Sequence, residues 1–344
     1  MLSDLLAAGA TSGLANRLRN LTVRYVTAAC AVQQLQALRQ FTGFTHLDIG
    51  GSRLQHCLTV ELTSALQAMP RLTRLRMCCR HMQFQDVAAA LISALQPLTH
   101  LQHLHLERSH LKGPGLAALA PALSAMPGLQ TLDLSRNLSY TSLDQVDDAK
   151  ALCTLLGVVP GLTHLDVSNR PLHDQGTAQL AKLLHDMTRL QTLKMCYTST
   201  SDEGMATFTP ALAALPHLHT LDLQNTELGP MSASALQPAL ARERSPLRVL
   251  HLGFSTLAVE SVHSLASGLS TATQLQGLAL GHTRLGDEGW VALAPALSCL
   301  GPSLQWLELG RHSVDAVGSA ALVSALKALT GLTCLKATSF FTPW

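Results

Sequence analysis

The sequence predicts an α/β solenoid, in which short strand–helix units follow one another along the chain. Three observations predict this class. The pattern Leu-x-x-Leu-x-Leu recurs, as in LQTLDL, LTHLDV and LHTLDL. Its copies lie at a nearly constant spacing, which is the mark of a repeat architecture. Each copy is followed by a segment whose apolar residues have helical periodicity.

The length of the repeat is the distance between the second leucines of successive patterns. Nine of the eleven intervals are 28 or 29 residues long, and the other two are 26 and 33. We therefore expect about 12 repeats. The twelve leucines are Leu21, Leu47, Leu75, Leu104, Leu132, Leu165, Leu193, Leu221, Leu250, Leu278, Leu307 and Leu335.

Each repeat divides into two halves. The first half alternates with period two, as at Leu101, Leu104 and Leu106, and predicts a short strand. The second half has helical spacing, as in GLAALAPALSAMPGL from Gly115 onward. A proline often precedes the next strand, where it cannot extend the helix. Such units stack with parallel strands inside and helices outside, and the stack curves because a helix is wider than a strand.

The unit L-x-x-L-x-L-x-x-[N/T/S]-x-L followed by G-x-x-x-L-A-x-A-L resembles the leucine-rich repeat of ribonuclease-inhibitor type. The alternation of 28 and 29 residues is similar to that subfamily's habit, and the resemblance covers roughly residues 18–340. It implies a curved horseshoe with a parallel inner β-sheet and outer helices. We expect residues 1–344 to form a single domain of this kind.

The ninth position of the pattern departs from the family's asparagine or cysteine. Only Asn137 keeps asparagine, and small hydroxyl residues that can still bond the turn backbone replace it in six repeats. Arg80, Arg170 and His312 are not equivalent, so we expect looser turns there. The six hydroxyl residues are Ser52, Ser109, Thr198, Thr226, Ser255 and Thr283.

Composition supports a large aliphatic core, because 47% of the 344 residues are hydrophobic and only 4% are aromatic. The net charge of +2 gives no reason to expect nucleic acid or a membrane as partner. The eight cysteines are scattered without a C-x-x-C pair, which indicates free thiols in a reducing compartment. We expect a cytoplasmic protein, with the nucleus as the alternative.

The two ends and one insertion interrupt the rhythm. Residues 1–20 predict an N-terminal helical cap, with a mitochondrial presequence as the alternative. Residues 336–344 end in SFFTPW, whose aromatic residues either cap the last strand or mark the edge of a longer array. The interval of 33 residues predicts a loop insertion at 138–150. Such insertions either bind partners or are tolerated at little cost.

The residue between the two strand leucines is predicted to point into the concavity. It is polar or charged in eleven of twelve repeats, which indicates a solvated face. We expect Asp133, Asp166 and Asp222 to contact a partner there. The full column is Thr22, Asp48, Arg76, His105, Asp133, Asp166, Lys194, Asp222, His251, Ala279, Glu308 and Lys336.

Two patches on this face are candidate binding sites. Arg74, Arg76 and Arg108 are expected to select an acidic patch of a partner protein. Around them are His46, Asp48, Cys78, Cys79, His103, His105 and Glu107. Two histidines and a carboxylate are a ligand set for zinc. The arginines on the intervening strand repel a cation, and we predict no metal and no cofactor.

The second patch is aromatic, in a protein with few aromatic residues. Interface hot spots favour tryptophan, tyrosine and arginine, so we expect Tyr197, Phe254 and Trp306 to anchor a partner. The alternative is that Phe254 or Trp306 packs against its own repeat. Accompanying residues of this patch are His251, His282 and Arg311.

No catalytic signature is present, since the dinucleotide, P-loop and nucleophile-elbow patterns are absent. An open sheet also offers neither an oxyanion hole nor exclusion of water. We therefore predict a non-enzymatic, monomeric scaffold that binds a protein or peptide in the concave face.

Two alternatives come from related repeat families. Similarity to Ran GTPase-activating proteins implies acceleration of GTP hydrolysis, with Arg74 or Arg76 as the residue to test, although the acidic tail of those proteins is missing. Similarity to the repeats of NLR innate immune receptors implies the sensing module of a larger system. Ribonuclease inhibition is a poor match, because those inhibitors are richer in cysteine and acidic surface.

Overall fold

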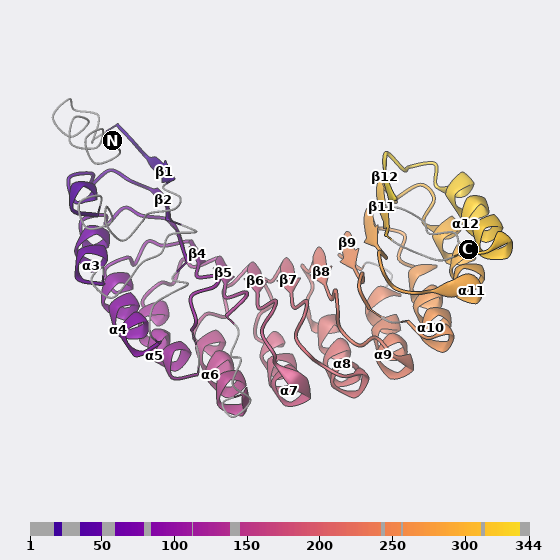
Figure 1. Ribbon diagram of the computed structural model, residues 1–344, viewed down its shortest axis with the longest axis horizontal. Helices are drawn as coiled ribbons and strands as arrows, with labels where there is room; N and C mark the ends of the chain where they lie inside the picture. Colours follow the sequence, from indigo (N-terminus) through magenta and orange to yellow (C-terminus); the bar gives the residue numbers. More distant parts are fainter. Residues whose placement is uncertain are drawn as a thin grey trace. The chain divides into compact units, whose positions relative to one another are not determined.

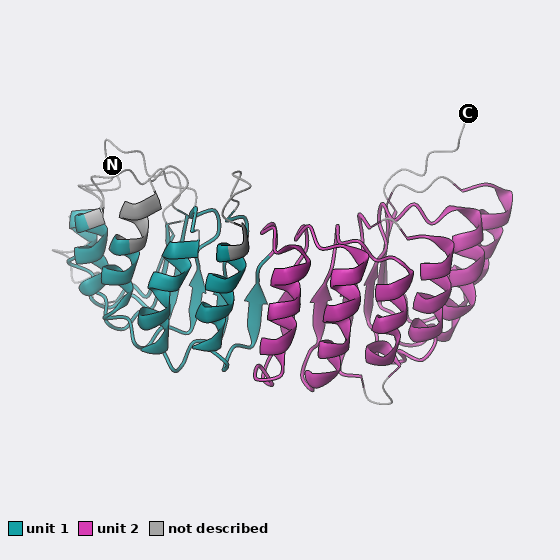
Figure 2. Ribbon diagram, turned by 90° about the horizontal axis from the view of Figure 1, so that it is seen from below, with its two compact units in different colours: residues 1–167 teal, residues 168–344 magenta. Residues whose placement is uncertain are grey.

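The structure is a computed structural model that divides into two units, residues 1–167 and 168–344, coloured separately in Figure 2. Each unit is a stack of strand–helix repeats and is described by itself. The described residues are 17–22, 35–49, 59–78, 84–111, 113–137, 145–241, 245–255, 257–310 and 314–337.

In its described part, unit 1 holds a parallel sheet in which each strand pairs with the next one in the chain. The register places Leu75 opposite both Leu47 and Leu104. Its strands are β1 (Asn20–Thr22), β2 (His46–Ile49), β3 (Arg74–Met77), β4 (His103–His105), β5 (Thr131–Asp133) and β6 (His164–Asp166). Its helices are α3 (Thr59–Gln67), α4 (Phe84–Leu95), α5 (Gly113–Ser124) and α6 (Gln145–Gly157).

The described part of unit 2 repeats this plan, and Leu250 lies opposite both Leu221 and Leu278. Its strands are β7 (Thr192–Lys194), β8 (Thr220–Asp222), β9 (Val249–His251), β10 (Gly277–Ala279), β11 (Trp306–Leu309) and β12 (Cys334–Ala337). Its helices are α7 (His173–Leu184), α8 (Asp202–Phe208), the 3₁₀ helix η3 (Thr209–Ala214), α9 (Pro230–Leu240), α10 (Val259–Leu269), α11 (Gly286–Cys299) and α12 (Ala316–Ala328).

The core of each unit lies between its sheet and its helices, which cover one face of the strands (Figure 1). The pattern leucines supply the sheet side of this core, and Leu75, Leu104 and Leu250 are 0% exposed. Every strand contains its predicted leucine. The predicted α/β class, the repeat length and the strand–helix order are therefore confirmed.

Three pairs of successive helices in the described part of unit 2 are linked at their N-termini by carboxylates. Asp174, in the first turn of α7, accepts hydrogen bonds from the backbone N–H (2.8 Å) and the hydroxyl (2.6 Å) of Ser201. Ser201 is the N-cap of α8 and accepts in turn from the N–H of Gly204. A Cβ at Gly204 would overlap the Asp174 carboxylate, so the first turn of this helix needs a glycine there. Asp202, in the first turn of α8, likewise accepts a hydrogen bond at 2.9 Å from the backbone N–H of Ser232 in α9.

The link recurs at α12. Asp287 accepts a hydrogen bond from the N–H of Asp315 at 2.7 Å. Asp315 is the N-cap of α12, and its carboxylate accepts from the N–H groups of Val317 and Gly318. Each of these carboxylates satisfies amides that a helix start leaves without an intrahelical partner.

At the ninth position of the pattern, two of the hydroxyl residues bond the turn backbone closely, as predicted, whereas Ser52 lies outside the described residues. Thr226 and Thr283 donate to the carbonyls of Leu223 and Leu280, at 2.7 and 2.8 Å. Arg170 is 1% exposed, so that turn holds a large buried side chain. The other two exceptions, Arg80 and His312, lie outside the described residues.

Asn137 makes the most extensive set of these bonds. Its Oδ1 accepts from the backbone N–H groups of Ser109 (2.8 Å) and Leu111 (3.1 Å), in the preceding repeat. Its Nδ2 donates to the carbonyls of Leu106 (3.0 Å) and Leu134 (2.8 Å). The side chain is 1% exposed. One amide thus joins two successive repeats in a buried environment.

Several expectations about ends and insertion fall largely outside the described residues. Positions 1–16 of the expected cap, 138–144 of the expected loop and 338–344 at the other end belong to this group. Residues 145–150 differ from the expected loop, because they form the start of helix α6. In the last strand Leu335 is 45% exposed. Among the described helices, none has the length and apolarity needed to cross a membrane.

We predict that Asn137→Ala lowers the free energy of unfolding by about 3 kcal/mol, because two buried N–H groups lose their acceptor. Urea unfolding followed by circular dichroism measures this. Thr226→Val is the matched control, since it removes one donated bond while keeping the shape, and we expect a loss of about 1 kcal/mol. Equal losses for the two variants would contradict the linking role of Asn137.

Candidate functional site

The candidate site is the sheet face opposite the helices. Its central column consists of the residues between the strand leucines, and these are exposed or half-exposed with one exception. The exception is Ala279 on β10, which is 1% exposed. The predicted solvated face is therefore present in both units.

In unit 1, Arg76 of β3 is held by two carboxylates. Its Nε and Nη2 lie 2.6 Å from Oε1 of Glu107, and its Nη1 lies 3.6 Å from Oδ2 of Asp48. The hydrogen bond to Glu107 raises the pKa of Arg76, against an opposing effect of burial, and the charges of Glu107, Asp48 and Asp133 also raise it. Its neighbour Arg74 is exposed and makes no ion pair within the described residues. Arg76 is thus paired with carboxylates of its own unit, and Arg74 faces solvent.

A second pair in unit 1 joins His105 of β4 to Asp133 of β5, with Nδ1 and Oδ2 3.5 Å apart. Asp133 also accepts from the backbone N–H of Ser135 at 2.9 Å. Burial alone would raise the pKa of Asp133, but the hydrogen bonds from His105 and Ser135 outweigh it and lower the pKa.

Ligand atoms of His105, Glu107 and Asp133 lie within 4.8 Å of one another, which is a possible cation-binding geometry. Of the ligand set considered from the sequence, which was His46 and His103 or His105 with a carboxylate, this group contains His105 but neither His46 nor His103. The guanidinium of Arg76 contacts Glu107 directly and opposes a cation there. This cluster is therefore better described as an internally paired network.

In unit 2 the turn after each strand presents side chains from an unusual backbone conformation. Tyr197, Phe254 and His282 follow β7, β9 and β10 with φ values of 57°, 59° and 62°. Asn225 takes the same place after β8, with φ 51°. This left-handed region favours glycine and asparagine, and a bulky residue there costs about 1 kcal/mol or more. Tyr197 and Phe254 are nevertheless 39% and 45% exposed.

The aromatic rings of unit 2 form two separate pairs. Phe254 stacks on His282, with ring centroids 4.4 Å apart and planes at 10°. Trp306 lies against His251, with centroids 5.3 Å apart and planes at 45°. Within the described residues no ring contact joins Tyr197 to either pair. The predicted patch is thus divided into an exposed part at the turns and a half-buried part on the strands.

Trp306 is held in place by the small residue beneath it. Gly277 of β10 lies opposite Trp306 in the register, and a Cβ at Gly277 would overlap the indole ring. The amine of Lys336, on β12, lies 6.0 Å from the ring centroid. Sequence reasoning missed Gly277, although a glycine inside a strand is a known sign of close approach by another group.

His251 is the most enclosed titratable group of this half-buried part. Burial lowers the pKa of His251 and the charges of Lys194 and Lys336 act in the same direction, while Asp222 and Glu308 oppose them. The Nδ1 of His251 lies 3.4 Å from the amide nitrogen of Gln224.

Of the remaining predicted site residues, Asp222 lies opposite His251 in the strand register. Arg108 follows β4 with φ 55°, and Asp166 is half-exposed on β6. Asp222 accepts from the backbone N–H of Gln224 at 3.1 Å, so it also supports its own turn. Arg311 lies outside the described residues.

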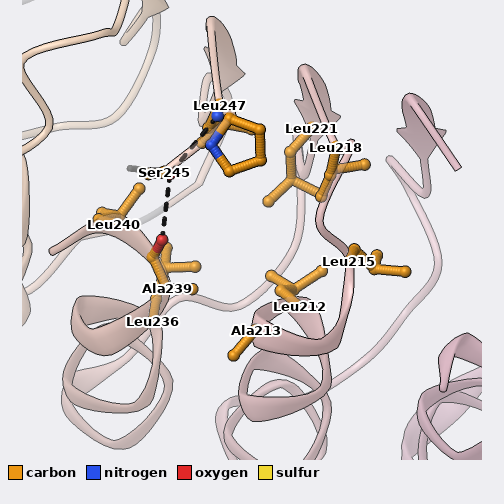
Figure 3. Close-up of a pocket in the computed structure, with 11 residues that line it drawn as sticks. Leu212, Ala213, Leu215, Leu218, Leu221, Leu236, Ala239, Leu240, Ser245 and Leu247 are labelled. Atoms are coloured by element: carbon orange, nitrogen blue, oxygen red, sulfur yellow. Dashed lines mark hydrogen bonds between the residues drawn. The ribbon is translucent and has the colours of Figure 1, made fainter. Parts of the chain in front are cut away.

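A small cavity in unit 2 offers no site for a ligand. It lies beside η3, between Leu212, Leu236 and Leu247, and Figure 3 shows its apolar lining. The hydroxyl of Ser245 at its edge donates to the carbonyl of Ala239 and accepts from the N–H of Leu247. Its volume is about 20 Å³, whereas pockets for small molecules usually span about 300–1,000 Å³.

Comparison with known proteins identifies relatives of this chain. A family model described as "Leucine Rich repeat" matches residues 98–120. Ribonuclease inhibitor of Sus scrofa is 27% identical over 311 residues, covering 82% of this chain and 67% of the inhibitor. NACHT, LRR and PYD domains-containing protein 12 of Homo sapiens is 27% identical over 278 residues, covering 72% of this chain and 26% of that protein. The chain spans about two thirds of the first relative and about a quarter of the second.

Among solved structures, an internalin of Listeria monocytogenes is similar with a TM-score of 0.53 and 17% sequence identity. The similarity covers 97% of this chain and 94% of the internalin. At this identity the likeness concerns the fold alone, and it confirms the leucine-rich-repeat solenoid predicted from the sequence.

We predict that Gly277→Ala displaces Trp306 from the sheet, because the added methyl group occupies the position of the indole. We expect a loss of about 1–3 kcal/mol in stability from overpacking. The displaced indole should be more accessible to acrylamide, as measured by fluorescence quenching. Gly128→Ala is the control, since a Cβ at Gly128 meets nothing within 4 Å. Equal quenching of wild type and Gly277→Ala would contradict this packing.

We predict that His251 weakens the fold in acid. Because the folded-state pKa lies below the ordinary value of about 6.5, the unfolded chain takes up the proton first. Stability is therefore complete above about pH 6.5 and falls below it. The melting temperature should fall between about pH 7.5 and 5.5, and we expect the fall to be smaller for His251→Gln than for wild type. His263→Gln, on the exposed surface of α10, should behave as wild type, and an identical loss in all three proteins would refute the prediction.

Proposed function

Because the chain is a leucine-rich-repeat protein of ribonuclease-inhibitor-like type, we propose that it is a non-enzymatic scaffold that binds a protein or peptide partner on its sheet face. The main anchors are Tyr197 and Phe254 of unit 2. The observation that carries the proposal is the conformation of these two residues, which are bulky, exposed and held at positive φ.

The conformation matters because stability alone favours other residues at these turns. Asn169 and Asn225 occupy equivalent turns with φ of 55° and 51°, and asparagine tolerates this region well. Tyr197 and Phe254 accept a conformational cost and also leave apolar surface in water. Strain of this kind is concentrated at functional sites, and a partner that covers both rings offsets it.

The side chains of Tyr197 and Phe254 are also suited to binding because few of their rotamers are accessible. Phe254 is stacked on His282 and each ring is fixed to a short turn, so little rotamer entropy is lost when a partner covers them. Tyr197 and Phe254 stand two strands apart, at about 10 Å from the usual strand spacing. One short peptide or one surface patch reaches both.

The relatives support protein binding as the class of function. Their names are those of a ribonuclease inhibitor and of a NACHT, LRR and PYD domains-containing protein. A sensing role of NLR type and a GTPase-activating role are the alternatives. Engagement of Arg76 by Glu107 and Asp48 disfavours Arg76 as a catalytic arginine. Residence in the cytosol and a monomeric state stay predictions of the sequence.

We predict that Tyr197→Gly/Phe254→Gly abolishes partner capture while leaving the melting temperature equal or higher, because glycine relieves the strained φ. Proteins captured from lysate by the immobilised chain are quantified by mass spectrometry. The partner is then purified and its affinity measured by calorimetry. We expect at least a tenfold loss of affinity in the variant.

The matched control is Met231→Ser/Val323→Ser, which removes two exposed apolar residues from helices α9 and α12, where they are 57% and 49% exposed. It should bind the partner as wild type does. A partner lost by the helix-side control and retained by the glycine variant would refute the assignment of the sheet face.

A further inference from the structure

Three histidines on the sheet face of unit 1 are each held by a threonine. The Nδ1 of His46 lies 2.9 Å from the Thr45 hydroxyl, and the Nδ1 of His164 lies 2.8 Å from the Thr163 hydroxyl. The Nδ1 of His103 lies 2.9 Å from the hydroxyl of Thr131 on the next strand. The same nitrogen is thus fixed in all three rings.

The three rings belong to one row that crosses the sheet. The register pairs His46 with Arg74, Arg74 with His103, His103 with Thr131, and Thr131 with His164. Neighbouring strands lie about 4.8 Å apart. Arg74 therefore stands between two histidines, and its exposed guanidinium makes no ion pair within the part of the chain that the structure describes.

The threonines determine which nitrogen carries the proton. The Thr45 hydroxyl donates to the carbonyl of Arg19 at 3.2 Å, and the Thr163 hydroxyl donates to the carbonyl of Gln130 at 3.1 Å. A hydroxyl has a single proton to donate. When that proton goes to the carbonyl, the ring Nδ1–H of His46 and of His164 is the donor to threonine, and the neutral Nε2 carries a lone pair. Protonation converts that lone pair to an N–H and adds a positive charge.

The carboxylates of this face lie on the neighbouring row rather than among the histidines. Asp48 and Glu107 contact Arg76, and Asp133 contacts His105. Asp166 completes that row on β6, and on β1 the row of histidines begins with the uncharged Asn20. Burial lowers the pKa of His103, and the charges of Arg74, His105, His164 and His46 lower it further. Arg74 therefore supplies the permanent positive charge of this row, next to a row that holds Asp48, Asp133 and Asp166.

We propose that His46, Arg74 and His103, with His164 beside them, form a pH-gated binding site for an acidic segment of a partner protein. Arg74 supplies a permanent charge for one carboxylate. Near neutral pH the flanking Nε2 lone pairs repel a carboxylate, whereas in mild acid they become charged donors. Charge complementarity identifies the occupant, because Arg74 disfavours a metal ion at the centre of the row. The proposal goes beyond the aromatic anchors of unit 2 and does not depend on them.

The test uses the full chain and a fluorescein-labelled hexaglutamate peptide, with hexaglutamine as the uncharged control peptide. Fluorescence anisotropy gives the affinity at about pH 7.5 and 5.5, a range that spans the ordinary histidine pKa of about 6.5 while glutamate stays ionised. We expect wild type to bind hexaglutamate at least tenfold more tightly at the lower pH. This increase in affinity at the lower pH should be smaller in high salt.

Two variants distinguish the contribution of the three histidines from that of Arg74. His46→Gln/His103→Gln/His164→Gln should change less than twofold in affinity between the two pH values. Its control, His185→Gln/His217→Gln/His263→Gln, removes three exposed histidines from unit 2 and should keep the full gain. Arg74→Gln should weaken binding several-fold at both pH values while retaining the gain. Melting temperatures at both pH values verify that each variant is folded.

Three results would overturn the proposal. The first is an equal gain in wild type and in the unit 1 triple variant. The second is equally tight binding of inorganic phosphate, which would indicate a site for a free anion. The third is tighter binding of a single-stranded oligonucleotide than of hexaglutamate. The Tyr197→Gly/Phe254→Gly variant should bind hexaglutamate as wild type does, so that failure of one proposal leaves the other intact.

Discussion

Both units depend on the alignment of one leucine with the equivalent leucine of the next strand. Leu75 lies opposite Leu47 and Leu104, and Leu250 lies opposite Leu221 and Leu278. Because side chains alternate between the faces of a strand, this alignment also fixes which residues leave the core. The residues on the other face can then differ from repeat to repeat without disturbing the buried leucines.

The face made available in this way is not uniform. Arg76 is paired with Glu107, His105 is paired with Asp133, and Trp306 rests on Gly277. These groups are ordered by contacts inside their own unit. A second group, Tyr197, Phe254 and Arg74, remains exposed, although Phe254 also stacks on His282. The second group has contact surface and charge to offer, which is why both proposals are built on it.

The fold could be predicted from sequence because its signal is repeated and local. Each strand needs only its own leucines, and a hydroxyl such as Thr226 can be matched to a turn carbonyl three residues away. The side-chain pairs could not be predicted in this way. Glu107 is 31 residues from Arg76 in sequence, and which carboxylate the guanidinium takes depends on rotamers.

Other misses have similar causes. The start of helix α6 at Gln145 was expected to be loop, because an insertion in a repeat says nothing about how its residues fold. Arg170 is a buried side chain, which its charge alone does not reveal. The position of Trp306 depends on the absence of a side chain at Gly277, one repeat earlier.

The carboxylates that link the helices of unit 2 give the array a direction. Asp174 completes the start of α8 and Asp202 completes the start of α9, whereas among the described residues of unit 2 no carboxylate of a later helix accepts from the start of an earlier one. A repeat that opens therefore deprives the repeat after it of its cap, and leaves the cap of the repeat before it in place. Loss of order should travel more easily toward the C-terminal end of the unit than toward its beginning, although the leucine contacts between repeats are nearly symmetrical.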